Sequence, residues 1–260
     1  MKRDNIFWGG VLILLGVLFL LQTQNIIPSI FPYLWPLALI LIGGWMVLNV
    51  YWRPTPSDED TFSMPLGEAK RVKYKFSHGA GEIEITGGAP MGQALVGSSA
   101  SGMNRNSHMD GDRLEVHVEA GASFIPFVGP ANGVWRFQLA QDVPITLKVE
   151  AGASQTKMDL KDVLATDIQL ETGASNTDVT MPARGASHLD LEAGVASVNI
   201  RVPEGTAARI RVKEGLTSLN VDTNRFPQLD SRLYQSSNFD SATDRAEISI
   251  EAGLGSITIK

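Results

Sequence analysis

The chain of 260 residues contains no cysteine, which excludes a disulfide framework, thiolate zinc sites and thiol redox chemistry. It also has only four histidines, His78, His108, His117 and His188, and none of them has the i,i+4 spacing that places two imidazoles on one metal. We therefore expect neither a metal nor a cofactor.

Positive charge is scarce as well. Lys and Arg number 22 against 28 Asp and Glu, so the formal net charge is −6 and the sequence pI is about 5.3. Without a basic stripe to neutralise phosphates, nucleic acid is not an expected partner. Glycine turns are present, but no helical pattern follows them, as a phosphate-binding loop or a nucleophile elbow would require. We expect no catalytic residues and no small-molecule substrate.

In place of helical spacing, the C-terminal three-quarters of the chain carries a repeat. Each copy is an alternating apolar run, a tight glycine turn and a second alternating run. Four turns, at Gly152, Gly173, Gly194 and Gly215, are spaced by 21 residues, and looser copies lie at Gly79, Gly121 and Gly253.

Within each copy, apolar residues lie three and five positions before the glycine, and most copies also have them four and six positions after it. Leu189 and Leu191 precede Gly194, for example, and Val198 and Ile200 follow it. This period of two predicts half-buried strands. Glycine reaches positive φ without a clash and lets backbones approach closely, so we interpret the seven glycines as structural turns. Residues 71–260 are therefore predicted to form an all-β repeat domain of stacked strands, a β-solenoid.

Acidic residues recur on the polar faces of the predicted strands, including Glu150, Glu171 and Glu192. Calcium-binding repeats place closely spaced Gly and Asp in the turns themselves, whereas these residues alternate with apolar ones. They are interpreted as an ordinary solvated face.

The N-terminus carries two uncharged apolar stretches separated by a turn that contains Pro28 and Pro32. Each is about long enough to cross a hydrocarbon core of roughly 30 Å. We predict a transmembrane helical hairpin over residues 1–53, with helices at about 5–22 and 33–52. Residues 54–70 are Pro-rich and acidic and are predicted to be a linker. A cleaved signal peptide is the alternative for the first stretch, although no A-x-A site follows it.

The few positive charges around these stretches predict the orientation. Lys2 and Arg3 precede the first stretch and Arg53 follows the second, while the connecting turn has none. The positive-inside rule then places the β domain in the cytoplasm. If the first stretch is cleaved or too short to span, the β domain is extracellular.

Two longer segments, 123–137 and 223–247, interrupt the repeat. Their aromatic residues are candidates for an interaction surface with a membrane or a partner. The alternative is that they cap the core or shield a sheet edge. The candidates are Phe124, Phe127, Trp135, Phe137, Tyr234 and Phe239.

Three stretches resemble a known family. WPLALILIGGWMVL, residues 35–48, is similar to the LiaI/LiaF-type transmembrane module. VNIRVPEGTAARIRVKEGLTSLNVD (198–222) and YQSSNFDSATDRAEISIEAGLGSITI (234–259) resemble the toast-rack β domain of LiaF-like bacterial envelope proteins. The resemblance implies a membrane-anchored, non-enzymatic protein associated with cell-envelope stress, which in some members restrains a sensor histidine kinase.

Two functions fit this sequence. The first is an interaction scaffold, anchored in the bilayer, that binds a membrane protein or associates with itself. The second is a surface-exposed adhesin-like module that binds glycans or lipid, and it requires the β domain to be outside the cell.

Overall fold

The computed structural model describes residues 60–99, 103–120 and 134–260. Thirteen strands make up this part of the chain: β1 Asp60–Pro65, β2 Arg71–Gly87, β3 Gln93–Ser99, β4 Met103–Asp110, β5 Arg113–Ala120, β6 Val134–Leu139, β7 Ile145–Asp159, β8 Ala165–Thr180, β9 Ala186–Arg201, β10 Ala207–Val221, β11 Gln228–Asp230, β12 Leu233–Gln235 and β13 Arg245–Ile259. The predicted helices 5–22 and 33–52 lie outside the described residues, and the described part has no helix of a length and apolarity that would cross a membrane.

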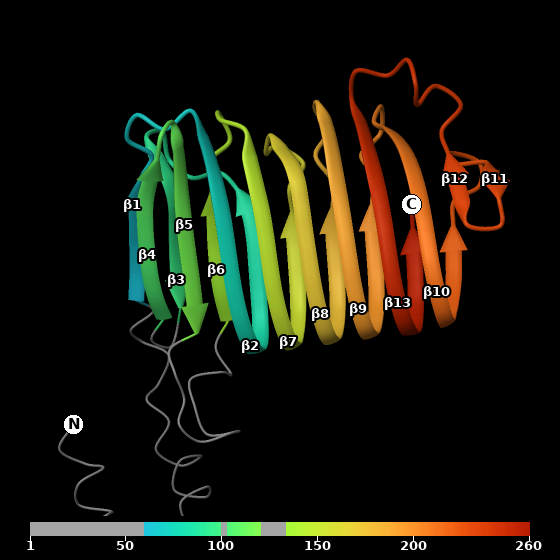
Figure 1. Cartoon of the computed structure of the whole chain (residues 1–260), viewed down its shortest axis with the longest axis horizontal. Helices are drawn as coiled ribbons and strands as arrows, with labels where there is room; N and C mark the ends of the chain where they lie inside the picture. Colours follow the sequence, from blue (N-terminus) through green and yellow to red (C-terminus); the bar gives the residue numbers. More distant parts are fainter. Residues whose placement is uncertain (1–59, 100–102, 121–133) are drawn as a thin grey trace, which may run out of the picture. The chain divides into compact units, whose positions relative to one another are not determined.

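Six long strands form a parallel stack in the order β2-β7-β8-β9-β13-β10. Each of them carries one of the predicted glycine turns. Figure 1 shows that each strand runs down one side of the domain, bends near its middle and returns on the other side. The predicted stack of repeated, bent strands is confirmed.

The bends divide the stack into two layers. Residues 71–77 of β2 pair with β5, whereas residues 82–87 of the same strand pair with β6. Between β2 and β7, the ladder joins His78 to Ala151 and resumes with Ala80 and Ala153, so the two corner glycines are skipped. The buried side chains next to the corner glycines of β7, β8, β9 and β13 are small: Ala151, Thr172, Ala193 and Ala252.

The core lies between the two layers, and its residues are those the alternation selects. Leu189 and Leu191 of β9 are fully buried, and Ile248 and Ile250 of β13 are at most 1% exposed. On the returning half, Val198 and Ile200 are 1% and 2% exposed. The period-two alternation therefore correctly identifies the buried face on both halves of each bent strand.

The corner glycines are required for a reason that was only half predicted. Positive φ occurs at several described glycines, such as Gly185 and Gly205, but not at the six described corners. What the corners need is space. A Cβ built on Gly173 would lie 2.9 Å from the carbonyl oxygen of Gly152, and one on Gly194 would lie 2.8 Å from that of Gly173. The glycines stack directly on one another, so close approach rather than backbone conformation selects them. Gly121 lies outside the described residues.

The order of the stack differs from the order of the chain. β13, the last strand in sequence, pairs in parallel with β9 on one side and with β10 on the other. The segment between β10 and β13 forms the short strands β11 and β12, and β12 pairs with Arg209, Ile210 and Arg211 of β10. Sequence periodicity is identical for any order of the coils, so it does not reveal this insertion.

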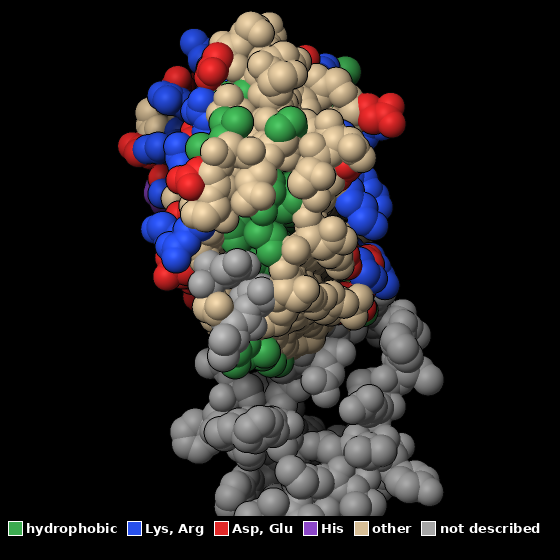
Figure 2. Space-filling view, turned by 90° about the vertical axis from the view of Figure 1, so that its right-hand side faces the viewer, with side chains coloured by type: hydrophobic (Ala, Val, Ile, Leu, Met, Phe, Trp, Pro, Cys, Tyr) green, Lys and Arg blue, Asp and Glu red, His purple; other side chains and the backbone are tan. Residues whose placement is uncertain are grey.

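The exposed end of the stack lies at β10. Figure 2, viewed from this end, shows charged side chains along both sides and a strip of apolar ones between them. Leu219 and Val221 are only partly buried, although their counterparts Ile257 and Ile259 in β13 are buried. The difference arises because β10 has a full-length neighbour on one side only.

The domain begins earlier than expected. β1 lies within residues 54–70, which were predicted to be a linker, and it pairs antiparallel with β3. Phe62 and Met64 pack against the core from this strand. A short edge strand that ends at Pro65 resembles a linker in sequence, because proline and acidic residues are also typical of edge strands.

The aromatic interaction surface is not formed by the four candidates that the structure describes. Trp135 and Phe137 belong to β6 and are each 1% exposed, and Tyr234 and Phe239 are also buried. Phe137 packs against Phe76, with ring centroids 4.5 Å apart. All four side chains are therefore buried rather than exposed on a surface. Phe124 and Phe127 lie outside the described residues.

Candidate functional site

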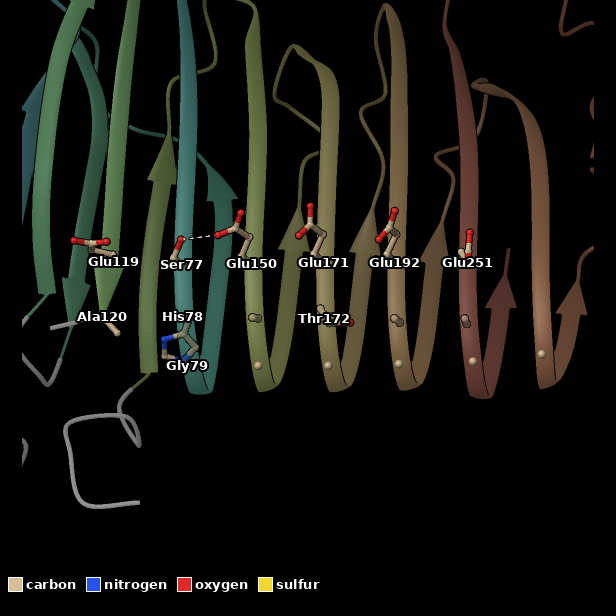
Figure 3. Close-up of a pocket in the computed structure, with 18 of the residues that line it drawn as sticks. Ser77, His78, Gly79, Glu119, Ala120, Glu150, Glu171, Thr172, Glu192 and Glu251 are labelled. Carbon is tan, nitrogen blue, oxygen red and sulfur yellow. Dashed lines mark hydrogen bonds between the residues drawn. The ribbon is translucent and has the colours of Figure 1, made fainter. Parts of the chain in front are cut away.

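A shallow groove follows the outer surface of the corners, across the strands (Figure 3). It has a volume of about 1060 Å³ and reaches from Ala120 at the end of β5 to Gly215 in β10. The corner glycines line it and contribute no side chain, so the row of glycines leaves a depression where other residues would fill the surface. The same close stacking that requires glycine therefore creates the groove.

One side of this groove is a row of glutamates, two residues before four of the six described corner glycines. In the parallel ladders, Glu150 pairs with Glu171, Glu171 with Glu192, and Glu192 with Glu251. Neighbouring strands are about 4.8 Å apart. Like charges directly opposite each other destabilise a sheet. Figure 3 shows the four carboxylates side by side above the corners. We call Glu150, Glu171, Glu192 and Glu251 the glutamate row.

Lysines neutralise the row at the β7 end. Lys148 Nζ lies 3.1 Å from Glu150 Oε1 and 2.8 Å from Glu171 Oε1, and Lys75 Nζ lies 3.2 Å from Glu150 Oε1. Ser77 Oγ also donates a hydrogen bond to Glu150 Oε2, at 3.0 Å. Partial burial disfavours the charged form of Glu150, but the bonds from Lys148, Lys75 and Ser77 together hold its pKa below the ordinary value. The pKa of Lys148 is raised by its bonds to Glu171 and Glu150.

The row has no such compensation at the other end. Glu192 and Glu251 are exposed, and no cationic side chain of the described residues lies within ion-pair distance of either carboxylate. Lys213 lines the groove and is in register with Glu251, but forms no ion pair with it. The part of the groove formed by β9 and β13 is therefore open and acidic.

A buried histidine lies at the β5 end of the groove. His78 lines the groove and is 4% exposed, and neither of its ring nitrogens has a hydrogen-bond partner. Its ring centroid is 4.4 Å from that of Trp135, whose buried indole nitrogen is also without a partner. Burial lowers the pKa of His78 below its ordinary value, so the imidazole is neutral near pH 7 and its free nitrogen is an acceptor.

Two other histidines come together although their sequence spacing is unremarkable. Pairing of β4 with β5 places His108 opposite Glu115, and His117 follows two residues later on the same face. The Nε2 atoms of His108 and His117 lie 3.5 Å and 3.9 Å from Glu115 Oε2. Within residues 60–99, 103–120 and 134–260, no group of three or more His, Asp or Glu is placed to hold a metal ion.

The sequence contained a signal for the groove that was interpreted as a solvated face. A glutamate two positions before Gly152, Gly173, Gly194 and Gly253 falls in one row as soon as the strands stack in register. The lysines that neutralise only one end of the row, and the unpartnered His78, could not be found this way. Both depend on neighbours that are distant in sequence.

Comparison with known families is decisive for the β domain. Residues 53–201 match the family model described as the N-terminal domain of toast_rack, DUF2154. The chain belongs to the toast-rack family. Residues 6–47 of this toast-rack protein match the LiaI-LiaF-like transmembrane region, which makes it a membrane protein. No curated protein matches it.

One solved structure shares the fold. The toast-rack chain is 18% identical to a Clostridium sporogenes ATCC 15579 protein provisionally named a cell adhesion protein, with a TM-score of 0.70, over 78% of this chain and 98% of that one. A Bacteroides fragilis NCTC 9343 protein provisionally named an adhesin is 9% identical over the same shares, with a TM-score of 0.27. The first likeness supports the fold and the second carries no argument.

Proposed function

We propose that this toast-rack protein is a non-enzymatic scaffold, anchored in the membrane, that binds another protein through its β domain. The observation that carries this proposal is the long groove across the corners, which is acidic and too shallow to enclose a substrate. Its glutamates are held in a row by the stack instead of converging on one point. Such an arrangement suits an extended binding surface rather than catalysis.

The transmembrane family match indicates where this scaffold acts. Members that the sequence resembles take part in cell-envelope stress responses, in some cases by restraining a sensor kinase, and we propose the same setting here. We further propose two membrane-spanning helices and a cytoplasmic β domain, from Lys2, Arg3 and Arg53. A topology reporter fused after Lys260 tests the side of the membrane.

Purification from native membranes tests the scaffold itself. The tagged full chain, solubilised in mild detergent, is expected to retain a membrane protein or a second copy in stoichiometric amount. A variant lacking residues 60–260 serves as the control and should lose the partner while remaining in the membrane. Recovery of the full chain alone, as a monomer, would contradict the scaffold.

A surface-exposed adhesion module is the second candidate. The fold shared with the protein provisionally named a cell adhesion protein favours it. It requires the β domain to lie outside the cell. Cleavage of the β domain by protease added to intact cells would favour adhesion over the cytoplasmic scaffold, and full protection would exclude it.

A further inference from the structure

We propose that the glutamate-row groove binds an extended segment of a partner protein that carries lysine or arginine, with its cationic side chains on Glu171, Glu192 and Glu251. The proposal deepens the scaffold function and rests on it, because it states the chemistry of the partner. Lys148 is shared by Glu150 and Glu171, and neither Glu192 nor Glu251 has a cationic side chain of the described residues within ion-pair distance. The row from Glu171 to Glu251 therefore carries more negative charge than the described cations neutralise.

Electrostatics is the first argument for a cationic occupant. The carboxylates of Glu171, Glu192 and Glu251 follow one another on adjacent parallel strands, about 4.8 Å apart. Each is more than one-third exposed, so solvent screens their repulsion without removing it. A row of ammonium or guanidinium groups would replace this repulsion by ion pairs.

The floor of the groove is the second argument. Gly173, Gly194 and Gly253 present bare backbone beside the carboxylates, so another main chain can approach closely. Side chains on one face of an extended segment recur about every 6.6–6.8 Å. The flexible stems of lysine and arginine accommodate the difference from the spacing of the carboxylates.

His78 is the third and independent argument. A buried imidazole with two unpartnered nitrogens is costly, and here it lies at the end of the groove next to an unpartnered indole N–H. Neutral His78 lines the groove and offers an acceptor for an N–H of the bound segment, whereas Trp135 does not line the groove. A peptide supplies such an N–H, which a simple metal cation does not.

Binding of a labelled octalysine peptide to the full chain in neutral detergent at low salt tests the proposal. The triple variant Glu171→Gln, Glu192→Gln, Glu251→Gln is expected to bind roughly tenfold more weakly, because three exposed ion pairs are lost. The matched control Glu68→Gln, Asp162→Asn, Glu204→Gln removes the same charge from exposed turns at the opposite edge and should stay within about twofold. Equal weakening in both variants would show a net-charge effect and overturn the site.

A second variant tests the histidine end. His78→Phe keeps a ring against Trp135 but removes the acceptor, and is expected to weaken octalysine binding roughly threefold. Unchanged binding would remove His78 from the site. If octalysine does not bind at all while the full chain still retains a membrane protein, the groove proposal fails and the scaffold function stands.

Discussion

The middle of the stack and its N-terminal end bury one continuous core by different means. The middle strands β7, β8, β9 and β13 repeat the same plan: small or aliphatic pairs inside, glycine at the corner and polar residues outside. At the N-terminal end, β1, β3 and β6 close the core with large aromatic side chains, among them Phe62, Trp135 and Phe137. The repeated strands pack with similar small or aliphatic side chains, whereas the N-terminal end of the core depends on a few large aromatic side chains. The two regions should therefore respond differently to substitution.

The largest effect is expected from a charge in the repeated core. Val198→Lys places an ammonium between the layers, where Val198 is 1% exposed, and should cost about 5 kcal/mol or more, comparable with the whole stability of the domain. Circular dichroism and thermal melting should show loss of the cooperative transition. Asn199→Lys, on the exposed face of the same strand, is the control and should melt normally. A Val198→Lys variant that folds and melts normally would show that this face of β9 is exposed to solvent.

Truncation of a ring at the closing end should come next. Phe137→Ala removes a side chain that packs against Phe76 and Phe62, and should cost about 3–5 kcal/mol. Ile200→Val in the middle should cost only about 0.5–1.5 kcal/mol. Urea titration of both variants measures the contrast. Similar losses at the two sites would remove the distinction between the regions.

Crowding at a corner should have a smaller but definite effect. Gly194→Ala introduces a Cβ 2.8 Å from the carbonyl oxygen of Gly173, which must move, at a cost of about 1–3 kcal/mol. Gly205→Ala meets no atom within 4 Å and is penalised only by its φ of +87°. A melting temperature unaffected by Gly194→Ala would contradict the stacking of the corners.

The smallest effect concerns pH and His78. Burial lowers the folded pKa of His78 below its ordinary value of 6.5, so the unfolded chain takes up the proton first. The contribution of His78 to the free energy of unfolding is therefore fully present above about pH 6.5. It decreases as the pH falls toward the pKa that His78 has in the folded protein. Comparison of urea midpoints at pH 7.5 and pH 5 should show a smaller decrease in His78→Phe than in the natural protein. An equal decrease would assign the pH dependence to other groups.

The contrast also explains how far the sequence could be interpreted. Alternation around Gly152, Gly173 and Gly194 was sufficient to predict strands, corners and inner faces, because each coil repeats a local rule. Trp135 and Phe137 were candidates for an interaction surface, with capping of the core as the alternative. The sequence did not decide between the two because the strand of these residues, β6, has no repeat partner in the sequence and pairs with β2 and β3 across long separations. The ion pair between Lys75 and Glu150 could not be predicted for the same reason. The two residues lie on neighbouring strands of the sheet, β2 and β7, that are far apart in the sequence.

The insertion of β13 between β9 and β10 is the most direct test of the stack, and the absence of cysteine makes it straightforward. Ser197 and Ser256 are paired in register, with their Oγ atoms 3.3 Å apart, while Ser218 is the next neighbour of Ser256. A Ser197→Cys, Ser256→Cys variant should form a disulfide readily under mild oxidation, because neighbouring strands bring the two Cβ atoms close. Ser197→Cys, Ser218→Cys should not, since β13 lies between those strands. A disulfide in the second pair and none in the first would show that the coils stack in chain order and would contradict the account.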